Sequence, residues 1–238
     1  MSSKTMLVVG AHSADFVWRA AGVAAVHASS GGKVVVAALS YGERGESGEL
    51  WKEPGQTEAK VKAIRHAEAK KAAAALGVEF KCLDLGDYPL RINEENINQV
   101  KDLYLEVAPH IVITHSENDP FNPDHPVAHE MVRRARLLSS GAGVASAFET
   151  LPPSEFLVFE PHQPELCGFV PNTFVDITPV MEAKKTAMEA MAAQKYLQQY
   201  YAERAEHRAN HARKSSGDSS IKFAEAFQRL TPHVVKSL

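Results

Sequence analysis

Short apolar runs alternate along this chain with longer segments in which apolar residues recur at helical spacing. An unbroken apolar run of about four to eight residues is typical of a strand that is covered on both faces. Strands are therefore expected at 6–9, 33–39, 80–85, 110–114, 156–159 and 174–177. Helices are expected at 15–29, 57–76, 96–107, 125–138 and 179–203, with a further short helix near Ala224.

This alternation of strands and helices predicts repeated β–α–β units. Such units give an α/β, Rossmann-like three-layer fold with a mostly parallel sheet and helices on both faces. Glycine marks two of the helix ends, because Gly31 and Gly32 follow the first predicted helix and Gly77 follows the long Ala-rich one. The chain contains no internal repeat and no linker-like segment, so we expect one domain over residues 1–238.

The composition is that of an ordinary globular protein, with 45% hydrophobic and 23% charged residues among 238. A net charge of −3 argues against a nucleic-acid binder, which usually carries a basic excess. No apolar stretch approaches the roughly 20 residues that span a bilayer, and the first residues lack the pattern of a signal peptide, so we expect neither a membrane span nor a signal peptide. The two cysteines, Cys82 and Cys167, form no metal motif or disulfide framework. We expect a cytoplasmic protein without a nucleic-acid or membrane partner.

Polar side chains follow several of the predicted strands. His12 and Asp15 come after the first strand, and Glu46 lies in a Gly- and Glu-rich loop after the second. His125 and His162 follow later strands. The carboxyl ends of parallel strands meet at one edge of a sheet, where His and carboxylate side chains can bind a metal such as zinc. Each residue alone is weak evidence, because Asp15 could equally cap a helix and the chain has 11 histidines.

Several motifs in a fixed order make the metal interpretation more specific. They are Gly-Ala-His-Ser-Ala-Asp at 10–15, Gly-Glu-Arg-Gly-Glu at 42–46, Arg-x-x-Glu at 65–68, Leu-Gly-Val at 76–78 and Pro-Asp-His at 123–125. Together they resemble the PIG-L family of zinc-dependent deacetylases over nearly the whole chain. The resemblance implies a metal-dependent catalytic domain and a homo-oligomer, with His12, Asp15 and His125 as the metal ligands. It also implies that Asp124 orients His125 or a neighbouring residue. Zinc suits this ligand set, and iron, manganese or cobalt could also occupy it.

The chain departs from the deacetylase pattern at two positions. Ala14 stands where the family carries the carboxylate that activates water, and Asn122 stands where the family tends to carry a histidine. Both changes remove groups that transfer protons and leave the metal ligands in place. Two alternatives stay open from this: an amide deacetylase with an atypical base, and a non-catalytic protein that binds a metal or carboxylates.

Longer segments resemble the hydratase branch of the same family. These segments are 10–19, 40–51, 119–130 and 159–167. That branch adds water across a carbon–carbon double bond of an unsaturated oxo-tricarboxylate, 4-oxalomesaconate, in gallate and protocatechuate 4,5-cleavage. The resemblance implies a lyase with Glu46 and His162 as the acid–base pair. The sequence does not assign the two roles, and we favour Glu46 as the base and His162 as the acid.

A substrate with three negative charges also requires cationic groups. Arginine suits this purpose because its guanidinium binds a carboxylate through two parallel hydrogen bonds. Arg44 on the Gly- and Glu-rich loop and Arg65 on the long helix are the candidates for substrate binding. Asn122 and His115 could add hydrogen bonds. The basic run at 204–213 also fits a solvated helix face.

Overall fold

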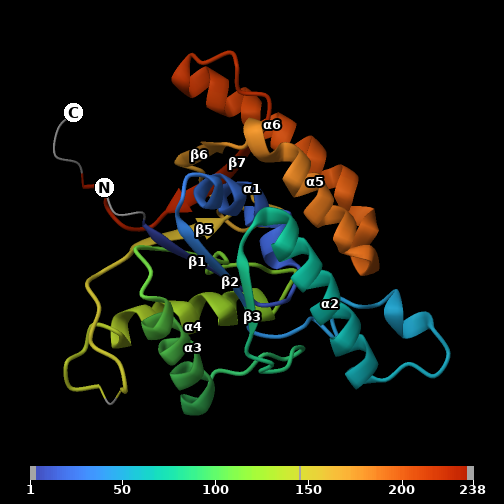
Figure 1. Ribbon diagram of the computed structural model, residues 1–238, viewed down its shortest axis with the longest axis vertical. Coiled ribbons are helices and arrows are strands. Elements are labelled where there is room, and N and C mark those ends of the chain that lie inside the picture. Colours follow the sequence, from blue (N-terminus) through green and yellow to red (C-terminus); the bar gives the residue numbers. More distant parts are fainter. Residues whose placement is uncertain (1–3, 145, 235–238) are drawn as a thin grey trace.

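The computed structural model describes residues 4–144 and 146–234, which form a seven-stranded sheet with helices around it (Figure 1). The strands lie in the order β3-β2-β1-β4-β5-β7-β6. Their bounds are Thr5–Gly10 for β1, Lys33–Ala38 for β2, Glu79–Cys82 for β3, Ile111–Thr114 for β4, Glu155–Phe159 for β5, Thr173–Asp176 for β6 and Ala224–Arg229 for β7. Strands β1 to β5 pair in parallel, and β7 is antiparallel to both β5 and β6. The predicted mostly parallel sheet is confirmed.

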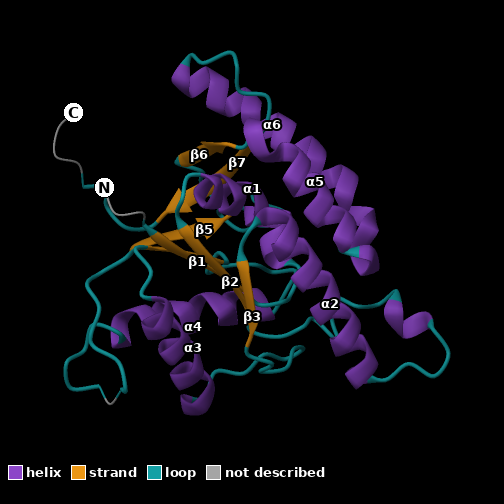
Figure 2. Cartoon of the chain, in the orientation of Figure 1, coloured by secondary structure: helices purple, strands orange, loops and turns teal. Residues whose placement is uncertain are grey.

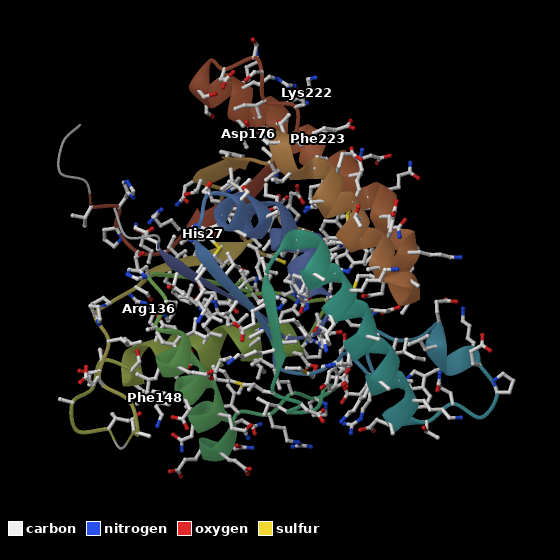
Figure 3. All side chains as sticks on the ribbon, in the orientation of Figure 1. His27, Arg136, Phe148, Asp176, Lys222 and Phe223 are labelled. Carbon is white, nitrogen blue, oxygen red and sulfur yellow. The ribbon has the colours of Figure 1, made fainter. Side chains whose placement is uncertain are left out.

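Helices cover both faces of this sheet, as predicted (Figure 2). Their bounds are Asp15–Ser29 for α1, Glu58–Leu76 for α2, Glu94–Val107 for α3, Asp124–Leu138 for α4, Met181–Ala190 for α5 and Gln198–Ser216 for α6. Residues of α1, α2, α5 and α6 share one hydrophobic core with one sheet face, and those of α3 and α4 share the core on the other. Figure 3 shows Arg136 on the side of α4 and Phe223 on the side of α6.

The central strand β1 shows why its sequence is an unbroken apolar run. Its side chains alternate between the two faces of the sheet. Met6 and Val8 pack in the core beneath α1 and α2, whereas Leu7 and Val9 pack in the core beneath α3 and α4. Because both faces are covered, every position after Thr5 is buried.

Two predictions for the C-terminal third are wrong. The single helix expected at 179–203 is divided into α5 and α6 by a 3-10 segment, Ala192–Leu197, in which Gln194 is non-helical (φ −131°, ψ 31°). The break carries the Gln194 side chain into the interior, where it bonds Arg65. The helix expected near Ala224 is instead β7, because this segment pairs with two strands that are distant in the sequence.

The order of the strands positions the candidate site. Strands β2, β1, β4 and β5 are neighbours, and each is followed at its carboxyl end by a loop that carries a candidate residue. These residues are Glu46 after β2, His12 after β1 and His162 after β5, whereas His125 follows the loop after β4 as the second residue of α4. Among the helices that the structure describes, none is long and apolar enough to cross a membrane.

Candidate active site

The turn between β1 and α1 brings His12 and Asp15 together. Asp15 begins the helix, and its Oδ2 atom accepts a hydrogen bond of 2.7 Å from the backbone N–H of His12. A Cβ atom at Gly10 would lie 2.7 Å from the Cβ of Asp15, so only glycine allows this close approach. Both side chains are buried. The local sequence therefore fixes the relative position of these two residues.

Four buried or nearly buried side chains converge here with the atoms that a metal ion binds. One donor atom from each of His12, Asp15, Glu46 and His125 lies within 4.8 Å of the others. Nδ1 of His12 lies 3.6 Å from Asp15 Oδ2, and Nε2 of His125 lies 3.7 Å from Asp15 Oδ1. These two nitrogens are buried and have no hydrogen-bond partner among the described residues. Because an unpaired buried nitrogen is costly, the arrangement fits a bound divalent cation.

The other nitrogen of each imidazole is held by a carboxylate. His12 Nε2 lies 3.2 Å from Asp124 Oδ2, and His125 Nδ1 lies 2.7 Å from Asp119 Oδ2. Asp124 also accepts the backbone N–H groups of Tyr88 and Leu90. Carboxylates commonly orient metal-binding histidines in this way. Asp124 thus orients His12 rather than the adjacent His125, and sequence reasoning missed Asp119, although it lies six residues before His125.

The charges in this cluster suit a cation. Burial alone would raise the pKa of Asp15, but His115 and Arg19 hold it well below its ordinary value, so the carboxylate is ionised. Burial holds the pKa of His125 well below its ordinary value, which keeps that ring neutral. Burial would lower the pKa of His12, but Glu46 and Asp124 raise it well above the ordinary value. The carboxylates therefore favour a positive charge at their centre.

His115 packs against the cluster through contacts with His125 and Asp15. Its ring stacks on His125 with centroids 3.9 Å apart, and its Nε2 lies 2.9 Å from the backbone nitrogen of Ala11 and 3.0 Å from Asp15 Oδ2. Burial lowers the pKa of His115 from its ordinary value. From the sequence we expected His115 only to add a hydrogen bond, and in the fold it contacts the cluster directly.

Glu46 extends from its loop into the cluster. Its Oε1 lies 3.3 Å from His12 Nδ1 without hydrogen-bond geometry, and it accepts a hydrogen bond of 3.0 Å from Asn122 Nδ2. Its Oε2 accepts one of 3.3 Å from Gln194 Nε2. Burial would raise the pKa of Glu46, but the charge of His12 and other contacts lower it to about 2. Glu46 is therefore an ionised carboxylate, and Asn122 and Gln194 fix its position.

A pocket with a volume of about 290 Å³ opens onto this cluster. Five of the residues that the sequence predicted for the site line it, namely Asp15, Glu46, Asn122, His125 and His162. The His162 ring stacks on Tyr200 with centroids 4.3 Å apart. Burial first, and then the charges of Arg19 and Arg204, lower the pKa of His162. The ionised Glu46 and His162, whose pKa is lowered, therefore line the same pocket beside the cluster.

The two predicted substrate-binding arginines do not line this pocket. Arg44 lies on the outer side of its loop, where its guanidinium pairs with the exposed carboxylate of Glu58 at 3.2 Å. Arg65 is completely buried and donates to Glu68 Oε2 and to Gln194 Oε1, each at 2.8 Å. The structure therefore does not bring Arg44 to the other candidates, and it gives Arg65 an indirect role, because Gln194 holds Glu46.

Sequence reasoning also missed two pocket residues, Arg19 and Tyr88. Arg19 is buried and donates from Nη1 to Asp15 Oδ1. Its spacing of four residues from Asp15 on a helix was the available signal. Tyr88 has a positive φ of 43°, and its ring covers Gly45 so closely that a Cβ there would lie 2.0 Å from a ring carbon. No local sequence pattern indicates this second contact.

Comparisons with known proteins agree with this geometry. The sequence model of the PIG-L family, described as GlcNAc-PI de-N-acetylase, matches residues 7–136. A 4-oxalmesaconate hydratase from Pseudomonas putida is 42% identical over 238 residues, which cover 99% of this chain and 92% of that protein.

Two solved structures extend the likeness to the fold. The 4-carboxy-2-hydroxymuconate hydratase of Pseudomonas putida superposes with a TM-score of 0.95 at 42% identity, covering 99% of each chain. An N,N'-diacetylchitobiose deacetylase from Pyrococcus horikoshii, 18% identical, shares the fold with a TM-score of 0.80 over 96% of this chain and 84% of that one. The family match covers more than half of the chain and the hydratase likeness nearly all of it, so this protein belongs to the PIG-L family.

Proposed function

We propose that this protein is a metal-dependent hydro-lyase that adds water across the carbon–carbon double bond of 4-oxalomesaconate, in gallate and protocatechuate catabolism. One observation carries the proposal: Glu46 and His162 both line the pocket beside the metal-binding cluster. The position of the carboxylate that activates water in the deacetylases is occupied by Ala14. The likeness to a hydratase at 42% identity over 99% of the chain supports it.

His12, Asp15 and His125 would hold the metal, for which we propose zinc. Their donor atoms include the two buried nitrogens that lack partners among the described residues. A bound divalent cation supplies Lewis acidity toward a substrate oxygen, or lowers the pKa of a bound water. Asp124 and Asp119 keep the two imidazoles in the orientation that presents these nitrogens.

Glu46 and His162 would carry the proton transfers. Glu46 is ionised and held by Asn122 and Gln194, so its carboxylate is ready to accept a proton from water. His162 would donate a proton to the substrate carbon. Its lowered pKa makes the protonated ring a stronger acid, and stacking on Tyr200 fixes the ring plane. Asn122 would contribute to substrate binding through the position that it gives Glu46.

The alternative of an amide deacetylase has less support. Ala14 is fully buried and has no group that accepts a proton, and Asn122 cannot act as an acid. A non-catalytic metal or carboxylate binder would not require an ionised carboxylate and a histidine on the same pocket. Neither alternative has an observation in its favour that the hydratase proposal lacks.

An ultraviolet assay tests the proposed reaction. Metal-loaded protein should remove the conjugated absorbance of 4-oxalomesaconate, and a chelator should stop this loss until metal is restored. Glu46→Gln should lower turnover by at least about 100-fold because a general base contributes roughly 10²- to 10⁴-fold. Its metal content, measured by atomic emission, should stay near that of the wild type. No turnover by metal-loaded wild-type protein would contradict the proposed function, and loss of metal in Glu46→Gln would make Glu46 a ligand instead of the base.

The remaining expectations concern the whole chain. We propose one catalytic domain over residues 1–238, acting in the cytoplasm as a homo-oligomer. One continuous sheet among the described residues supports a single domain. Two free cysteines support the cytoplasm, where thiols stay reduced. Light scattering after size-exclusion chromatography tests the assembly.

A further inference from the structure

Arg19 is a buried cation on the wall of the pocket. It lies one helical turn after Asp15 on α1, so the two side chains share one face of the helix. Only 9% of the residue is exposed, and it lines the same pocket as Glu46 and His162. Among the described residues that line this pocket, Arg19 is the one lysine or arginine.

Most of the hydrogen-bond donors of Arg19 have no acceptor among the described residues. A guanidinium carries five N–H donors, and one of those on Nη1 bonds Oδ1 of Asp15. Nε is buried and has no hydrogen-bond partner in the described part of the chain. Leaving a buried donor without an acceptor is costly. The described residues therefore do not satisfy this guanidinium fully.

The orientation of the guanidinium is also fixed. Its Cζ atom lies 5.7 Å from the centroid of the Phe159 ring, within the range of a cation–π contact. Asp15 holds Nη1 and Nε is buried, so among the described residues Nη2 is the nitrogen left to bond an acceptor in the pocket. A guanidinium N–H forms a strong, charge-assisted hydrogen bond with a carboxylate oxygen.

The charges around the pocket point to the same role. Arg204 and Arg208 line a separate small cavity with Arg19, and both form ion pairs with Glu160, which offsets part of their positive charge. The carboxylates on the pocket wall are those of Asp15, Glu46 and Asp119. These carboxylates would repel an anionic substrate. Of the described side chains on the wall, Arg19 supplies the permanent positive charge that opposes this repulsion.

We infer that Arg19 binds one particular carboxylate of the substrate through Nη2 and contributes to the selectivity of the pocket for a tricarboxylate. The inference rests on the proposed function, since it assigns a receptor for one charge of that substrate. Neither of the arginines that the sequence indicated, Arg44 and Arg65, reaches the pocket wall. The contact is made by a residue that also holds Asp15, so the substrate and the metal-binding cluster share one guanidinium.

A ligand series tests the contact. The variants are Arg19→Met and Arg19→Lys, with Arg133→Met as the matched control, because Arg133 is exposed on α4 and pairs with Glu130. Inhibition of 4-oxalomesaconate turnover is measured with trans-aconitate and with the three dicarboxylates that each lack one of its carboxylates: mesaconate, glutaconate and itaconate. Metal content is measured for every variant.

Arg19→Met should weaken trans-aconitate and two of the dicarboxylates by about 10- to 100-fold, the usual size of a hydrogen bond to a charged group. The dicarboxylate that lacks the recognised carboxylate should bind wild type and Arg19→Met equally. Arg19→Lys should recover part of the loss, and Arg133→Met should match the wild type. Equal weakening of all four ligands, an unchanged series, or loss of metal in Arg19→Met would overturn the inference. A wild-type protein without turnover would instead contradict the proposed function.

Discussion

The bond between His125 and Asp119 offers a direct test of whether the cluster of His12, Asp15, Glu46 and His125 is built to bind a metal. His125 Nδ1 donates to Asp119 Oδ2 at 2.7 Å, and Oδ1 of the same carboxylate accepts the backbone N–H of Phe121 at 3.0 Å. Asp119→Asn keeps the shape of the side chain. If its amide oxygen stays on the Phe121 N–H, the amide NH₂ faces His125 Nδ1. The ring must then carry its proton on Nε2, the atom that faces the cluster.

The size of the effect follows from this change of tautomer. A metal must displace the proton on Nε2, or the amide must rotate and lose the Phe121 bond. Removing a carboxylate that orients a metal ligand lowers metal affinity by roughly 10- to 100-fold. That range corresponds to about 1.4 to 2.7 kcal/mol. We expect Asp119→Asn to lie in this range while its fold, followed by circular dichroism, stays intact.

The assay is a competition between the protein and a chromophoric chelator for zinc. Asp176→Asn is the matched control, because Asp176 is exposed and accepts the backbone N–H of Thr178 at 2.9 Å in the same local arrangement. This control should bind zinc as the wild type does. If Asp119→Asn binds zinc within about twofold of the wild type, the carboxylate does not orient His125 for a metal and the reasoning fails.

Two further predictions concern the pocket. In Gly45→Ala the new Cβ would lie 2.0 Å from a ring carbon of Tyr88, so this ring on the pocket wall must move. Such a displacement should lower turnover by about 10-fold or more. Gly48→Ala is the control, because apart from its chain neighbours no atom of the described residues would lie within 4 Å of the new Cβ, and equal turnover of the two variants would argue against a role for the packing. Burial and the charges of Arg19 and Arg204 lower the pKa of His162 from 6.5. If His162 is the acid, kcat/KM should fall as the pH rises through that lowered pKa, because the ring loses the proton that it donates. A pH–rate profile that rises through this range would assign His162 as the base.

Much of the fold follows from the sequence because its signals are local. The apolar run of β1 is buried on both faces, and Gly77 ends α2 in the left-handed conformation (φ 69°). The wrong predictions lie where contacts between residues distant in the sequence determine the secondary structure. The break before α6 puts Gln194 on Arg65, which lies 129 residues earlier, and β7 pairs with β5 and β6. A short window of sequence around either segment does not include these distant partners, so its periodicity cannot predict them.

The candidate site divides in the same way. By itself the sequence determined the pair His12 and Asp15, since one turn at the end of a strand fixes both, and the motifs indicated Glu46 and His162. Only the tertiary structure decided which cation reaches the pocket and which carboxylate orients each imidazole. Arg19 takes that place instead of Arg44, which pairs with a glutamate outside the pocket. The physical reason is that a charged side chain acts through the partner that it meets, and in this fold most of those partners come from other strands and helices.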